Sequence, residues 1–280
     1  MRTQEKHATR FRSIQTSLLF VIVPAVIISM AVLSLMGYLS SKAIIQTSAG
    51  NEMSQCLSVA MGSIEMSLSN NRMVAETMAR GVEAVQRQAV KGEQTASDWD
   101  AAAYQEILTS FVGSNPETFG GGIWFEPYQY RPEQRYFSPY CMRQNGAVTY
   151  VDNYSLGEGV YYTDQDWYTN AANTTQKSVW SAPYYDEFAQ ISMVTSSAPI
   201  YDETGRFLGV ATADIDLTQM QQMVLSLDVV ANGRAFLIDD TGVYIADEDS
   251  EKLLSANILE DDNPSFAALG RQILSQQEGS

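Results

Sequence analysis

The longest uninterrupted apolar segment of the chain lies near its beginning. Residues 18–39, LLFVIVPAVIISMAVLSLMGYL, form 22 consecutive positions without a charged side chain. At 1.5 Å per residue, a helix of this length crosses a hydrocarbon core of about 30 Å. A cleaved signal peptide is the alternative, but its apolar centre usually runs only about 7 to 15 residues. We therefore expect an uncleaved transmembrane helix over residues 18–39.

The charges before this segment predict its orientation. Residues 1–17 contain one acid, Glu5, and four bases, which are Arg2, Lys6, Arg10 and Arg12. Positive charge beside a membrane helix favours the cytoplasmic side. We therefore expect a cytoplasmic tail over residues 1–17, a single span in the plasma (inner) membrane, and an extracytoplasmic location for everything after about residue 40.

Beyond the span, apolar positions recur in steps of four and three. This pattern, called the heptad seam below, comprises Leu57, Met61, Ile64, Leu68, Asn71, Ala75, Met78, Val82 and Val85, and only Asn71 in it is polar. Such spacing predicts a long amphipathic helix, here over residues 40–91. Two interpretations remain open. The helix packs against its own domain, or it forms a parallel dimer in which Asn71 fixes the register.

From residue 92 the long helical pattern gives way to shorter predicted elements. The stretch GEQTASD interrupts the helical pattern, and Ser97 or Asp98 is a plausible cap for a shorter helix that follows it. Short β-like runs separated by turn signals begin near residue 119, with QNG (144–146) as a hairpin turn. The expected strands are 120–128, 135–143, 147–154, 178–186, 191–202 and 206–217, with helices over 166–175 and 217–227.

A second, incomplete series of predicted strands and a helix begins at residue 234. Two strands, RAFLIDD and VYIADED, flank the turn TG, and PSFAALGRQILSQQ reads as a helix. Asp239 and Asp240 fit a turn better than a calcium site. The fold class is α+β, with antiparallel sheets of PAS-like order and helices on one face. We expect two such modules, over residues 92–229 and 230–280, the second lacking strands that a complete sheet would need.

Charge and composition exclude several classes of function. The formal net charge is −16, whereas proteins that bind nucleic acids neutralise phosphates with clustered bases. His7 is the only histidine, and Cys56 and Cys141 are the only cysteines. Histidine-based catalytic triads, His/Cys metal sites and disulfide scaffolds are therefore unsupported. We expect no catalytic residue, no metal and no cofactor.

One stretch concentrates rings and acids. Residues 164–188 hold six aromatic rings and four carboxylates, with Lys177 as their single base. The face of each aromatic ring attracts a cation with an interaction free energy of about 0.5 to 2 kcal/mol. Carboxylates form ion pairs with cations. The composition therefore favours a pocket for a cation. The alternative is that tryptophans such as Trp167 and Trp180 are core anchors, as large aromatics usually are.

The order of motifs along the chain is similar to that of a known family of sensory domains. A span, a long helix, and then DWY, VWSAPYYDE, PIYDETGRFLGVATADIDL, GRAFLIDDTGVYIADED and NILEDDNPSFAALG resemble the double-Cache sensory ectodomain of bacterial methyl-accepting chemotaxis receptors. The resemblance covers most of residues 10–280. It implies a membrane-distal module that holds a small ligand between its sheet and a covering short helix, and a truncated membrane-proximal module.

The resemblance also implies ligand-binding residues. In the amino-acid-binding branch, an Arg two residues before a Trp-Tyr pair grips the carboxylate, and a Tyr-x-Asp and a later Asp hold the amine. The matching positions here are Gln165, Trp167, Tyr168, Tyr184, Asp186 and Asp214. An amide at position 165 cannot supply the bidentate grip of a guanidinium on a carboxylate. The substitution favours an amine or a quaternary ammonium compound over an amino acid, which remains possible.

The resulting hypothesis is extracytoplasmic sensing by a transmembrane chemoreceptor. It implies a homodimer, and cytoplasmic signalling proteins reached through an output domain that this chain lacks. Similar ectodomains are also the sensory parts of histidine kinases, diguanylate cyclases and phosphatases. Two other classes stay open: an extracytoplasmic hydrolase that uses Asp186 and Asp214 as its carboxylates, and a ligand-free ectodomain for dimerisation.

Overall fold

The computed structural model describes residues 14–91, 101–151, 154, 159–227 and 234–276. It divides the chain into two compact units, Met1–Gln55 and Cys56–Ser280. The first unit consists, in its described part, of the N-terminal portion of helix α1 (Ile14–Lys91). It contains an apolar stretch that is long enough and hydrophobic enough to cross a membrane. The side chains of this stretch are exposed from Ile22 onward. The expected cap at Ser97 or Asp98 lies outside the described residues.

The second unit is built on one antiparallel sheet. Its strands lie in the order β3-β2-β1-β7-β6-β4, and β5 also pairs with β6. They comprise β1 (Gly120–Phe125), β2 (Tyr140–Gln144), β3 (Ala147–Val151), β4 (Val179–Trp180), β5 (Tyr184–Asp186), β6 (Ile191–Tyr201) and β7 (Phe207–Asp216). The expected QNG hairpin is confirmed, because Asn145 and Gly146 between β2 and β3 both have positive φ. The strand expected over 135–143 begins only at Tyr140.

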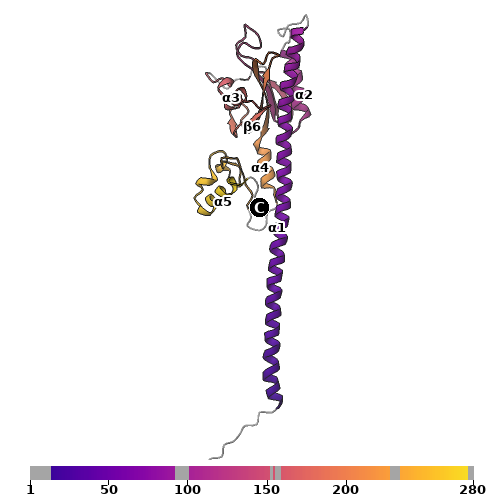
Figure 1. Ribbon diagram of the computed structural model, residues 1–280, viewed down its shortest axis with the longest axis vertical. Coiled ribbons are helices and arrows are strands. Elements are labelled where there is room, and N and C mark those ends of the chain that lie inside the picture. The colour runs from indigo at the N-terminus through magenta and orange to yellow at the C-terminus, as the bar shows by residue number, and fades with distance from the viewer. Residues whose placement is uncertain (1–13, 92–100, 152–153, 155–158, 228–233, 277–280) are drawn as a thin grey trace, which may run out of the picture. The chain divides into compact units, whose positions relative to one another are not determined.

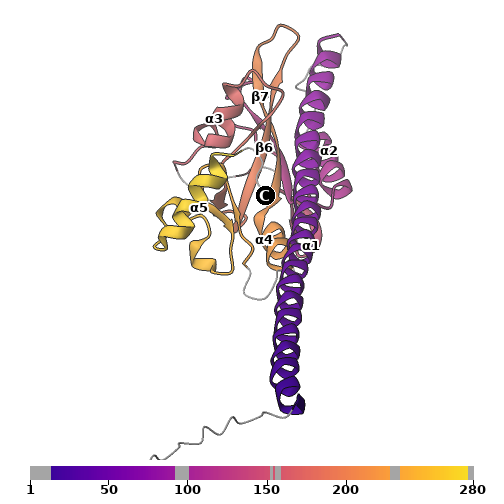
Figure 2. The ribbon, with the colours of Figure 1, turned by 60° about the horizontal axis from the view of Figure 1, so that its bottom comes forward.

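Helices cover both faces of this sheet, so the prediction of helices on one face was wrong. The C-terminal part of α1 and helix α2 (Ala101–Ser114) pack on one face, and the short helix α3 (Asp166–Ala172) lies on the other (Figures 1 and 2). Alternation along β7 explains the division. Ala211 and Ala213 point into the α1/α2 core, whereas Val210, Thr212 and Asp214 point toward the α3 side.

The heptad seam divides into two parts. Ala75, Met78 and Val82 are fully buried in the core beneath the sheet, so the interpretation of α1 packing against its own domain is confirmed for this half. Leu57 and Met61, in contrast, are 45% and 58% exposed. The earlier part of the seam is therefore open to a second interaction.

The remaining elements follow the predicted order. Helix α4 (Leu217–Leu225) follows β7 and is capped by Asp216. After residue 233, the short strands β8 (Leu237–Ile238) and β9 (Tyr244–Ala246) pair, and helix α5 (Pro264–Leu274) follows. The Asp239 carboxylate accepts hydrogen bonds from the backbone of Thr241 and Val243, as the turn interpretation predicted.

Candidate functional site

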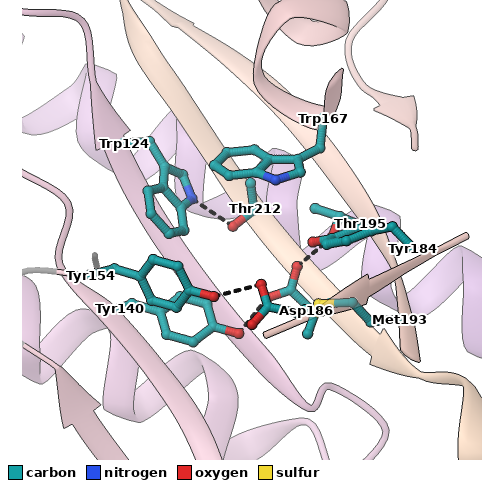
Figure 3. A pocket seen from close by; sticks show the side chains of 10 residues that line it. Trp124, Tyr140, Tyr154, Trp167, Tyr184, Asp186, Met193, Thr195 and Thr212 are labelled. Atoms are coloured by element: carbon teal, nitrogen blue, oxygen red, sulfur yellow. Dashed lines mark hydrogen bonds between the residues drawn. The ribbon is translucent and has the colours of Figure 1, made fainter. Parts of the chain in front are cut away.

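A pocket lies on the α3 side of the sheet. It is lined by Trp124, Tyr140, Tyr154, Trp167, Tyr184, Asp186, Met193, Thr195, Thr212 and Asp214 (Figure 3). Its cavity volume is about 10 Å³, which is room for about one water molecule. A ligand would therefore have to be small, and the lining side chains would have to move apart to admit it.

The sheet contributes most of the lining by simple alternation. Met193 with Thr195, Thr212 with Asp214, and Tyr184 with Asp186 are each two residues apart on β6, β7 and β5. Side chains two apart on a strand share a face. Thr195 and Asp214 also lie directly opposite each other in the β6–β7 ladder. Helix α3 adds Trp167 from above the sheet.

Two glycines on β1 make room for the pocket's rings. A Cβ at Gly120 would lie 2.1 Å from the Tyr140 hydroxyl, and one at Gly122 would lie 2.9 Å from the Trp124 ring. Both rings can thus lie close to the sheet. The Trp124 indole donates a hydrogen bond to the Thr212 hydroxyl (2.8 Å), which fixes its orientation.

Within the described part of the chain, the groups that donate to Asp214 are all neutral. Tyr140 and Thr195 donate hydrogen bonds of 2.7 and 2.8 Å to its two oxygens, and its residue is 3% exposed. Burial raises the pKa of Asp214 to about 7; the hydrogen bonds from Tyr140 and Thr195 oppose this shift, and the Asp186 charge adds to it. Asp214 can therefore gain or lose a proton near neutral pH.

Asp186 has a different set of donors. Tyr154 donates to one of its oxygens (2.6 Å), and the backbone N–H of Ala189 donates to the other (2.7 Å). The second bond closes the turn after β5. Burial and the bond to Asp186 raise the pKa of Tyr154 well above its ordinary value, so this phenol remains a donor.

The hydrogen bonds around Thr195 have one direction while Asp214 is ionised. The Thr195 hydroxyl has one proton and donates it to Asp214, and Tyr184 is its other partner at 2.8 Å. Tyr184 must then donate to Thr195. Burial raises the pKa of Tyr184, which keeps that proton on the phenol. The Tyr184 oxygen keeps its acceptor capacity for a ligand.

No arginine or lysine lines the pocket in the described part of the chain. Arg143 donates to backbone carbonyls of Thr118 and Asn115, and Arg206 pairs with Asp202. Arg131 and Arg135 lie over the rings of Tyr130 and Tyr136. Two buried carboxylates thus face one pocket, and no cationic side chain of the described residues lies beside them.

Only some of the site residues predicted from the sequence line the pocket. Trp167, Tyr184, Asp186 and Asp214 line the pocket. Tyr168 does not; it is buried in the neighbouring aromatic cluster, and its hydroxyl donates to Glu126 (2.7 Å). Gln165 does not either, because it occupies the N-cap position of α3 and its amide points to the Tyr161 carbonyl (3.4 Å).

Six lining residues outside the aromatic stretch were not predicted from the sequence: Trp124, Tyr140, Tyr154, Met193, Thr195 and Thr212. A signal existed for Thr212, which precedes Asp214 by two on a predicted strand. Thr195 could be found only through the register of β6 against β7. Tyr140 and Tyr154 reach the acids by tertiary packing that no local pattern encodes.

Comparison with known proteins agrees with this fold. Residues 104–222 match the family model for the first PDC sensor domain of methyl-accepting chemotaxis protein-like proteins. The chain is 38% identical over 84 residues to the methyl-accepting chemotaxis protein McpC of Bacillus subtilis, covering 30% of this chain and 13% of McpC. It is 24% identical over 208 residues to McpA of Pseudomonas putida, covering 72% of this chain and 31% of McpA. The chain thus spans less than a third of the length of these relatives.

Solved structures share the architecture. The extracellular domain of a protein described as a histidine kinase, mmHK1S-Z3, is similar with a TM-score of 0.61 at 21% identity, covering 76% of both chains. The sensory domain of the Campylobacter jejuni chemoreceptor Tlp3 with isoleucine bound is similar with a TM-score of 0.55 at 18% identity, covering 81% of this chain and 80% of that one. Residues 104–222 are therefore similar to the first PDC sensor domain of methyl-accepting chemotaxis protein-like proteins.

Proposed function

We propose that this chain is the extracytoplasmic sensory part of a transmembrane chemoreceptor, and that its pocket binds a small cation bearing an amine or a quaternary ammonium group. The observation that carries the ligand class is the pair Asp186 and Asp214. Both are buried, both line one pocket, and no basic side chain of the described residues lines it with them. Buried charge without a partner is costly, so a bound cation would be strongly favoured.

The aromatic walls support the same ligand class. The centroids of Trp124 and Trp167 lie 4.7 Å apart, and Tyr154 meets Trp124 edge-on at 5.2 Å. The faces of such rings attract cations. The position that would grip a carboxylate in the amino-acid-binding branch is Gln165, which lies outside the pocket lining. Among similar proteins, Tlp3 has been solved with isoleucine bound, so an amino acid is the competing ligand class.

The apolar stretch of α1 supports membrane anchoring. We infer that residues 18–39 cross the plasma membrane with residues 1–17 in the cytoplasm, and that residues after about 40 are outside. The matches to chemotaxis proteins favour a chemoreceptor output over a kinase, and cytoplasmic signalling proteins as its partners. Ligand binding would act by shifting the population of two states of the receptor, limited by its differential affinity for them.

Isothermal titration calorimetry on the full chain in lipid nanodiscs tests the ligand class. We expect 2-aminopropane or tetramethylammonium to bind, and Asp214→Ala to weaken binding by on the order of 2 kcal/mol or more. Asp166→Asn is the matched control, because Asp166 lies in the same acidic stretch on α3 but is exposed. Tight binding of succinate, or amine binding indifferent to both Asp186→Ala and Asp214→Ala, would contradict the proposal.

A further inference from the structure

The pocket has a second, neutral end. Thr212 accepts a hydrogen bond from Trp124, but its own hydroxyl proton has no acceptor among the described residues. Trp167 is 7% exposed, and its indole N–H has no acceptor in the same part of the chain. Figure 3 shows the Trp167 nitrogen on the ring edge that faces Thr212 and Thr195. Two donors that line the pocket thus remain unused at this end among the described residues.

A third polar group lies next to them. Ser197 is fully buried, and its hydroxyl has no hydrogen-bond partner in the described residues. It lies directly opposite Thr212 in the β6–β7 ladder and two residues from Thr195, so it shares the pocket side of the sheet. Buried polar groups are rarely left without partners. Their concentration here points to a polar group that a ligand would supply.

The spacing of the two ends limits the size of the ligand. Thr212 and Asp214 are two residues apart on β7, which corresponds to roughly 7 Å along the strand. Two hydrogen bonds of about 2.9 Å each take up most of that distance. A ligand that bonds to both residues must therefore be short, with its amine and oxygen only a few bonds apart.

The chemistry of the neutral end selects the oxygen. Thr212 and Trp167 can donate only neutral hydrogen bonds, and Asp186 and Asp214 place two carboxylates in the same pocket. A ligand carboxylate would be repelled by these acids without a guanidinium to offset the repulsion. A hydroxyl accepts from Thr212 or Trp167 at no such cost.

We propose that the pocket recognises short amino alcohols, with the amine on Asp186 and Asp214 and the hydroxyl on Thr212 and Trp167. This rests on the proposed function and narrows its ligand class. Three compounds with one carbon skeleton separate the possibilities: 2-aminopropane has the amine alone, 2-amino-1-propanol adds a hydroxyl, and alanine has a carboxylate in its place. A single net hydrogen bond corresponds to a preference of up to about tenfold.

Calorimetry on the full chain in nanodiscs should rank 2-amino-1-propanol about tenfold tighter than 2-aminopropane, with alanine weakest. Trp167→Phe and Thr212→Val should each reduce that preference, measured as the ratio of the two affinities in the same variant, and Thr212→Ser should keep it. Because Thr212→Val also removes the acceptor of Trp124, the ranking in the unmodified chain is the primary test.

The outcomes are distinct. Equal binding of 2-aminopropane and 2-amino-1-propanol would overturn the amino-alcohol proposal and leave the amine site standing. Tightest binding by alanine would also overturn it and favour an amino-acid receptor. Binding of none of the three compounds would overturn both the amino-alcohol proposal and the amine class of the proposed function.

Discussion

The Thr118 hydroxyl donates a 2.9 Å hydrogen bond to the side-chain oxygen of Asn71, and both residues are buried. Asn71 is the one polar position of the heptad seam, so its polarity serves a contact within the chain. Thr118 immediately precedes Phe119, whose backbone N–H donates to the Asp214 carbonyl (2.8 Å). A short path of bonds therefore joins α1 to the strand that carries a pocket acid.

Removing this contact should destabilise the domain. Thr118→Val leaves the Asn71 oxygen buried without a donor, and we expect it to lower the free energy of unfolding by about 1 to 3 kcal/mol. Thr118→Ser keeps the hydroxyl and should cost clearly less. Urea unfolding of the chain measures both variants. If Thr118→Val were as stable as the unmodified chain, the bond would not fix the position of α1.

The glycines of β1 offer a test of the pocket that touches neither acid. Gly120→Ala would place a Cβ 2.1 Å from the Tyr140 hydroxyl, displacing the phenol that binds Asp214. We expect amine affinity to fall by about tenfold or more, the effect of losing a hydrogen bond to a charged group. Gly113→Ala on α2 is the control, because a Cβ there meets no atom within 4 Å. Equal affinities in the two variants would argue against the role of Tyr140.

Ligand binding should release a proton. The pKa of Asp214 is about 7 without a ligand because the carboxylate is buried, and a bound cation favours the ionised form. Below pH 7 the carboxyl is mostly protonated, so amine affinity should weaken by up to about tenfold per pH unit as the pH falls. Above pH 7 it should level off. The other titratable groups of the pocket are Asp186 and the phenols of Tyr140, Tyr154 and Tyr184.

Calorimetry at pH 6.5 in buffers of different ionisation enthalpy counts the released protons directly. We expect more than half a proton per amine bound in the unmodified chain, and close to none in Asp214→Asn. An affinity that does not change between pH 5.5 and 8 would show that Asp214 is not the titrating group.

The exposed part of the heptad seam predicts a dimer contact. Leu57 and Met61 are large apolar side chains in water on α1, whereas Met78 is fully buried. In a Cys56→Ser background, a cysteine at Met61 should therefore crosslink to its counterpart in membranes more efficiently than one at Arg72, which is exposed on another part of α1. Similar crosslinking at both positions would leave α1 as a helix that serves only its own domain.

Local pattern was enough to predict most of the fold. The apolar run, the heptad seam, the QNG hairpin and the helices at 166 and 217 all depend on periodicity and turn chemistry close in sequence. The site was harder. Trp167, Tyr184, Asp186 and Asp214 were found through a resemblance, whereas Tyr140 and Tyr154 reach these acids across 74 and 32 residues of sequence. Side-chain contacts over such separations are set by the packing of the whole domain.

While Asp214 is ionised, the hydrogen bonds run from Tyr184 through Thr195 to Asp214. When Asp214 takes up a proton, it can donate to Thr195, which then donates to Tyr184. The Tyr184 hydroxyl proton then points into the pocket. This phenol therefore donates a hydrogen bond where it previously accepted one. Two hydroxyl rotations thus reverse the polarity of a surface several bonds away from the proton, without any movement of the backbone.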